Sequence, residues 1–302
     1  MDDTVRAIRC STVTACTDYH LHTPLCHHAE GWPTDYIAPA RAAGLAEIGF
    51  SEHSPMQADD FDDWRMRFSD LPRYRQEIDQ ARAQAGPDLP VRLGLECDFI
   101  DTPDQRRWLE QLRQAAPWDY WIGSVHYLDN GFPIDDPREA HQWSGADIDD
   151  LWQRYWRLFS TAVRTGWFSF MAHPDLIKKF GHRASGDLRR FYEPAVQALT
   201  DADVAFEFST AGWHKPCAEA YPADPFLQLA LEAGVPIVIS SDAHHPDHVG
   251  RDFHRAVRHL GQLGFTRLAR FARGERTLYP LPESTPGADP KPSIPKPTPP
   301  AG

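Results

Sequence analysis

The chain has 302 residues, of which 41% are hydrophobic, and its formal net charge is −12. This length suits one large α/β domain or two small ones, and the acidic balance excludes a general electrostatic attraction for nucleic acid. No run approaches the ~20 consecutive apolar residues of a membrane-spanning helix, and the first residues lack the apolar segment of a secretory signal. The five widely spaced cysteines predict reduced thiols, so we expect a cytoplasmic protein with no membrane partner.

Composition divides the chain into three parts. Residues 1–13 carry little pattern and are predicted to be an N-terminal extension. Residues 282–302 are rich in proline and lack large apolar side chains, which predicts a disordered tail. Residues 14–281 contain no linker and no repeat of fixed period, so they are predicted to form one domain.

Short apolar runs alternate with longer segments of helical period along this domain. We predict helices over 34–44 (capped by Thr34 and ended by Gly44), 70–85, 103–115, 147–166 (capped by Asp147), 186–200, 224–233 and 249–263. The strands between them are predicted to be buried on both faces: TACTDYHLH, AEIGFSEH, VRLGLECDFI, DYWIGSVHYL, WFSFMAHPD, VAFEFSTAG and VPIVISSDAH. Alternating strands and helices indicate a parallel sheet with crossover helices.

Most of the predicted strands end in side chains that can bind metals. These side chains are His20, His22, His53, Glu96, His126, His173, Asp242 and His244. In an α/β barrel the carboxyl ends of all strands converge on one mouth, whereas the outer strands of a doubly wound open sheet lie too far apart to share a site. The pattern therefore favours a distorted barrel of seven β/α units.

The spacing of these residues strengthens the metal hypothesis. His20 and His22 are two apart in a strand and point to the same face, although such a pair also arises by chance among 15 histidines. Glu96 ends a buried strand, where an uncompensated charge costs several kcal/mol. Asp242 and His244 repeat the two-residue spacing.

Each residue alone could have a structural role, such as packing or a hydrogen bond at the end of a strand. It is improbable that such roles explain all of these residues at the ends of six different strands. With His28 on the loop after the first strand, nine candidates exceed the three or four protein ligands of one zinc site. We therefore expect two or three divalent ions, which could be Zn, Mn or Fe. Such a centre hydrolyses phosphate esters, and the absence of a Gly-x-x-x-x-Gly-Lys loop argues against a nucleoside triphosphate held in that way.

The motifs DYHLHTPLCHHAEG, GFSEHSPM, GLECDF, IGSVHYL, AHPDLIKKFGHR, STAG and SSDAHHP resemble, in that order, the polymerase and histidinol phosphatase (PHP) superfamily and its histidinol-phosphatase branch. The resemblance implies a distorted (β/α)7 barrel with a trinuclear metal centre. It assigns one ion to His20, His22, Glu96 and Asp242, a second to Glu96, His126 and His173, and a third to His28, His53 and His244.

The resemblance also implies hydrolysis of L-histidinol phosphate, a step of histidine biosynthesis. Asp242 and His244 are then the candidates for the catalytic acid. Basic residues after the fifth and sixth strands are candidates for binding the phosphate, although Lys178 and Arg183 also fit a solvated basic stretch. The substrate-binding candidates are Lys179, His182, Arg183, His214 and Lys215.

Three other functions fit parts of the pattern. A PHP phosphoesterase could act on another small phosphate ester or a nucleotide, but the chain carries no nucleic-acid-binding module. An amidohydrolase-type barrel also begins with His-x-His, but it does not need Glu96 and His126 together. A degenerate regulatory subunit would have lost ligands, whereas this set is complete. The sequence does not predict the oligomeric state.

Overall fold

A computed structural model describes residues 16–129 and 131–283 of the chain. The predicted N-terminal extension and most of the predicted tail lie outside these residues. Seven strands of the described part form one parallel sheet in chain order: β1 (Thr17–Leu21), β2 (Glu47–His53), β3 (Val91–Asp98), β4 (Tyr120–Ser124), β5 (Phe170–Met171), β6 (Ala205–Ser209) and β7 (Ile237–Ser240).

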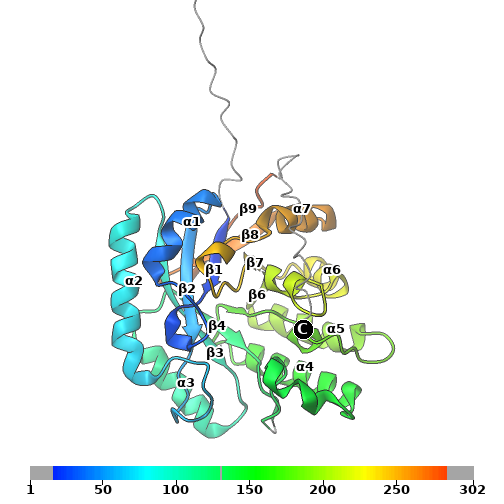
Figure 1. The fold of residues 1–302 in the computed structure, drawn as a ribbon. Helices are drawn as coiled ribbons and strands as arrows, with labels where there is room; N and C mark the ends of the chain where they lie inside the picture. Colours follow the sequence, from blue (N-terminus) through cyan, green and yellow to red (C-terminus); the bar gives the residue numbers. More distant parts are fainter. Residues whose placement is uncertain (1–15, 130, 284–302) are drawn as a thin grey trace, which may run out of the picture.

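The sheet curls into a nearly closed barrel. The segment after β7 returns to the end of β1, where the His22 amide donates to the Ala243 carbonyl at 2.9 Å and the Ala243 amide donates to the His20 carbonyl at 2.9 Å. Helices surround the strands in Figure 1. They are α1 (Ile37–Ala42), α2 (Leu71–Ala85), α3 (Pro103–Ala115), α4 (Ile148–Arg164), α5 (Arg189–Ala202), α6 (Asp224–Glu232) and α7 (Phe253–Leu263). The predicted barrel of seven β/α units is therefore confirmed.

Of the two predicted helix caps, one is confirmed and one is wrong. The Asp147 side chain accepts from the Asp150 amide at 3.1 Å and begins α4, as predicted. Thr34 is not a cap, because a 3-10 turn over Pro33–Tyr36 precedes α1. In that turn the Asp35 side chain accepts from the Trp32 amide at 2.7 Å. Within the described residues, no helix has both the length and the apolar character that crossing a membrane requires.

An antiparallel hairpin closes the amino-terminal end of the barrel. Its strands are β8 (Arg267–Ala272) and β9 (Glu275–Pro280), and neither was predicted from the sequence. Phe271 of β8 stacks on Phe170 of β5 with ring centroids 5.5 Å apart, and the Phe271 amide donates to the Tyr19 hydroxyl at 3.3 Å. The hairpin thus fills one end of the barrel with apolar side chains and leaves the carboxyl ends of the strands open.

Candidate metal centre

Glu96, near the end of β3, lies at the centre of the predicted ligands. Its Oε2 atom is 2.8 Å from Nδ1 of His53 and 3.2 Å from Nε2 of His20. Its Oε1 atom is 3.0 Å from Nε2 of His173 and 3.6 Å from Nε2 of His126. The two oxygens of one carboxylate therefore face two separate groups of imidazoles, which is the arrangement that a bridging ligand needs.

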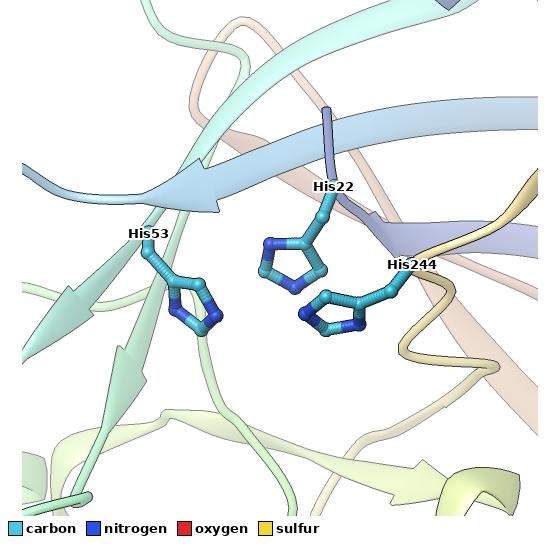
Figure 2. A group of neighbouring side chains, drawn as sticks. All are labelled: His22, His53 and His244. Carbon is cyan, nitrogen blue, oxygen red and sulfur yellow. The ribbon is translucent and has the colours of Figure 1, made fainter. Parts of the chain in front are cut away.

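Asp242 lies beside the first of these groups. Its Oδ1 atom is 3.4 Å from Nε2 of His22 and 3.8 Å from Nε2 of His20. Figure 2 shows the rings of His22, His53 and His244 gathered around a common space. The His22 ring centroid is 4.1 Å from that of His244 and 4.3 Å from that of His53. Strands β1, β2 and β7 thus place nitrogen donors together although the residues are far apart in sequence.

The loop after β1 adds His28 to this group. The His28 ring lies 4.6 Å from the His244 ring and 5.4 Å from the His53 ring, measured between centroids. Its Nδ1 is 2.8 Å from the Cys26 carbonyl oxygen, which leaves Nε2 as the free ligand atom. His27 instead occupies the left-handed cap of a 3-10 turn, with φ at 66°. The geometry therefore places the ring of His28 beside the rings of His53 and His244.

Several buried ring and carboxylate atoms in this cluster have no hydrogen-bond partner. They are Nε2 of His20, His22 and His244, Nδ1 of His53 and His173, and Oε2 of Glu96. A buried polar atom without a partner costs free energy, and a cluster of such atoms from nitrogen and oxygen donors is what divalent cations would satisfy. The residues present fit divalent metal ions.

The carboxylates of the cluster and His53 have the ionisation states that bind metals, whereas neighbouring carboxylates outweigh burial and raise the pKa of His22 to about 9 and that of His126 to about 10. Burial would raise the pKa of Glu96, but the charges of His20, His53 and His126 outweigh burial and hold that pKa well below its usual range. The pKa of Asp242 is also held well below its usual range for the same reason. Burial lowers the pKa of His53 well below the usual imidazole value. Ionised carboxylates and neutral imidazoles are the forms that bind metals.

Three buried carboxylates contact the outer ring nitrogens of candidate ligand histidines, and sequence reasoning missed all of them. A histidine ligand commonly gives its second ring nitrogen to a carboxylate, which fixes the ring and its tautomer. The pairs are Glu207 with Nδ1 of His20 at 2.7 Å, Glu52 with Nδ1 of His22 at 3.3 Å, and Asp98 with Nδ1 of His126 at 2.8 Å. In each pair Nε2 is left to face the centre.

A cavity of about 700 Å³ opens above the cluster. Its lining includes three of the predicted substrate-binding residues: Lys179, His214 and Lys215. It also includes Trp64, Asp135 and Arg251, which sequence reasoning did not single out. The volume is within the range of small-molecule sites.

Two predicted substrate-binding residues lie elsewhere. The His182 ring stacks on Trp143 with centroids 4.8 Å apart, outside the cavity lining. Arg183 pairs with Glu219 at 2.7 Å and lines a different hollow. The expected solvated basic stretch is also wrong for Lys178, which is fully buried 2.9 Å from an Asp175 carboxylate oxygen. The loop after β5 turns these side chains away from the mouth, which their position in the sequence does not reveal.

The parallel barrel and the cluster of imidazoles and carboxylates at its mouth define a metal-dependent hydrolase. Comparison with known proteins makes this specific. The PHP domain family model matches residues 18–211, and the chain belongs to that family.

Several relatives cover most of the chain. A Deinococcus radiodurans protein named "Probable histidinol-phosphatase" is 40% identical over 252 residues, which are 83% of this chain and 95% of that protein. The histidinol-phosphatase of Bacillus subtilis is 28% identical over 77% of this chain and 95% of its own length. A crystal structure of the Lactococcus lactis histidinol phosphate phosphatase, complexed with Zn, L-histidinol and phosphate, shares the fold. Its TM-score is 0.70 with 23% identity, covering 87% of this chain and all of that one.

Proposed function

We propose that this protein is a metal-dependent phosphomonoesterase that hydrolyses L-histidinol phosphate to L-histidinol and phosphate. The observation that carries the proposal is the position of Glu96, whose two carboxylate oxygens each face a different set of imidazoles below a small-molecule cavity. Relatives that cover most of the chain are named histidinol-phosphatases, which selects the substrate within the family. A cytoplasmic location fits a biosynthetic enzyme of this kind.

The ligand sets follow the two oxygens of Glu96. We assign the Oε2 side to an ion held with His20, His22 and Asp242, and the Oε1 side to an ion held with His126 and His173. A third ion is assigned to His28, His53 and His244. Bound Zn, Mn or Fe ions would supply Lewis acidity and a water of lowered pKa for attack on phosphorus.

The protein's own residues bind the phosphate ester and transfer the proton that the reaction requires. The phosphorus–oxygen bond to histidinol breaks as water adds to phosphorus, so the departing alkoxide needs one proton. Asp242 and His244 stand 3.5 Å apart at the cavity floor and are the candidates for carrying this proton. Because Asp242 is ionised, it has to take the proton from the attacking water before passing it to the alkoxide. Lys215 faces the cavity with no described carboxylate paired to it, and we assign it to the phosphate.

The remaining lining suits the other end of a bipolar substrate. Trp64 lies against the ligand histidines, with its ring centroid 4.8 Å from that of His53. Its indole nitrogen donates to the Tyr127 hydroxyl at 3.1 Å, which fixes the ring in the cavity wall. This wall offers an aromatic surface for the imidazole group of histidinol. Asp135 also lines the cavity, where it is already paired with Lys179 at 3.1 Å.

Steady-state kinetics of the metal-loaded protein test the proposal. We expect kcat/KM for histidinol phosphate to exceed that for nucleoside monophosphates, a cyclic phosphate and an amide by about a hundred-fold or more, because the site must satisfy the substrate's polar groups. A chelator should remove the activity, and Zn, Mn or Fe should restore it. Equal slow rates on all phosphate esters would contradict the substrate assignment, and cleavage of the amide alone would favour the amidohydrolase alternative.

A further inference from the structure

The cationic side chains around the metal cavity differ in whether they already have a counter-ion. Four lysines and arginines line it: Arg138, Lys179, Lys215 and Arg251. Arg138 pairs with Asp63 at 2.8 Å, and Lys179 pairs with Asp135 at 3.1 Å. In the described part of the chain, no carboxylate forms an ion pair with Lys215 or Arg251. Two of the four positive charges are therefore free to meet an anion.

Arg251 lies where an unpaired charge is costly. Its side chain is half-buried, and its Nε atom is shielded from solvent without a hydrogen-bond partner. Burial lowers the pKa of Arg251, and the charges of Asp252 and Asp242 oppose this only in part. A shielded guanidinium nitrogen without a hydrogen-bond partner costs free energy, so the position of Arg251 at the cavity is better explained by a ligand than by structure.

The backbone around Arg251 is held in place on both sides. The Arg251 amide donates to the His248 carbonyl at 3.1 Å, and its carbonyl accepts from the Thr210 hydroxyl at 2.8 Å. The preceding Gly250 amide donates to Asp18 of β1 at 2.9 Å. These bonds connect the segment to β1 and to the residue after β6, so the backbone that carries the Arg251 side chain is held at the edge of the cavity.

Lys215 approaches the same cavity from the segment after β6. Partial desolvation of its ammonium group lowers the pKa of Lys215, and repulsion from Lys179 adds to this effect. An anion that enters between Lys215 and Arg251 would relieve both unpaired charges. A phosphate monoester is such an anion, and a planar guanidinium matches two phosphate oxygens at once.

We propose that Arg251 is a phosphate-binding residue that, with Lys215, holds the non-reacting oxygens of the substrate phosphate. This assignment rests on the proposed function for its substrate, but its chemistry applies to any phosphate monoester and to the inorganic phosphate product. It also orients the substrate, because the phosphate lies toward β6 and β7 while the rest extends toward Trp64 and β2.

Calorimetry with inorganic phosphate on the zinc-loaded full-length protein tests this role. We expect Arg251→Met to weaken phosphate binding about ten-fold to a hundred-fold, the range of one lost charge-assisted contact. Arg251→Lys should recover part of the loss, because a lysine restores the positive charge but lacks the planar guanidinium that can bind two phosphate oxygens. Arg138→Met, which removes a cavity arginine that already has counter-ions, should bind phosphate as the wild type does. Affinity for L-histidinol should be the same in Arg251→Met and wild type.

Two results with the Arg251→Met variant would overturn the proposal: phosphate affinity equal to that of the wild type, or an equal loss of phosphate and L-histidinol binding. Zinc content and circular dichroism verify that each variant is folded, and Arg251→Gln replaces Arg251→Met if the latter fails to fold. If the wild type binds phosphate but does not turn over histidinol phosphate, the proposed function fails while the assignment of Arg251 stands. A wild type that binds no phosphate would refute the assignment of Arg251 as well.

Discussion

The two ends of the barrel are built from the same strands, but they differ in how their buried polar atoms are hydrogen-bonded. At the amino-terminal end, the Tyr120 hydroxyl donates to the Tyr19 carbonyl at 2.6 Å, and the Tyr19 hydroxyl is bonded to Glu47. At the carboxyl end, buried ring nitrogens such as Nε2 of His20 and of His22 have no partner. Single buried atoms without a partner also occur elsewhere in the described residues, as at Nε of Arg92 near the start of β3. The gathering of several such imidazole and carboxylate atoms at one place therefore marks the functional end of this barrel.

Glu96→Gln tests the carboxyl end most severely. The substitution keeps the shape of the side chain but removes the charge that two groups of imidazoles share. We expect kcat on histidinol phosphate to fall on the order of a hundred- to a thousand-fold, because positioned electrostatic groups have effects of that size. Bound metal, measured by elemental analysis, should fall as well. Glu47→Gln, a buried carboxylate at the opposite end, is the matched control and should keep kcat and metal content.

Phe271→Ala tests the amino-terminal end. The ring is buried against Phe170 and Tyr19, so its removal leaves a cavity in the apolar packing between the β8–β9 hairpin and the barrel. We expect the free energy of unfolding to fall by about 3–5 kcal/mol, the usual cost of such a truncation. Chemical denaturation measures this change. The kcat per folded molecule should stay at the wild-type value, and a parallel loss of kcat would mean that the two ends are not independent.

The sequence predicts this division only in part. The seven buried runs and their polar ends are enough to predict a barrel with ligands at one mouth, because parallel strands bring their carboxyl ends together. The hairpin was missed although Arg273 and Gly274 form a two-residue turn with positive φ at both positions, which is a recognisable hairpin turn. Its strands alternate only weakly between buried and exposed residues, so the period-two signal is faint.

The details of the site depend on contacts that sequence spacing does not encode. Glu207 is a carboxylate inside an otherwise apolar strand, the same signal that identified Glu96, and it could have been found by that argument. Arg251 follows the last ligand by several residues in a loop, and only the folded chain shows that it faces the cavity. Arg183 was expected at the cavity because it follows a strand that ends in a candidate ligand, but it pairs with Glu219 instead. Closeness in sequence to such a strand does not determine the direction of a side chain.

Glu207→Gln tests whether residues that contact the candidate ligands, without facing the metal site themselves, also contribute to the carboxyl end of the barrel. Glu207 accepts from Nδ1 of His20 and from the His173 amide, so it holds two ligand residues in position. We expect zinc affinity to fall about ten-fold to a hundred-fold, the usual effect of losing such support. Competition with a chromophoric chelator measures it. An unchanged zinc affinity, with Glu47→Gln as reference, would mean that His20 is held by packing alone.

Asp18 of β1 holds the loop that follows β7. Its carboxylate accepts from the Ser241 amide at 3.1 Å and from the Gly250 amide at 2.9 Å, so it connects this loop at the mouth of the barrel to β1. Burial outweighs these hydrogen bonds and raises the pKa of Asp18 to about 6, above the ~3.9 of an exposed carboxyl. Because the pKa is higher in the folded state, this group stabilises the fold fully below pH ~3.9, and that contribution is lost as the pH rises through about 6. Asp18→Asn cannot titrate, so the stability of the wild type relative to this variant should fall by about 1 kcal/mol between pH 5 and pH 7. Urea denaturation of both proteins at the two pH values measures the difference, and a gap that stays constant would show that the hydrogen bonds keep Asp18 ionised throughout.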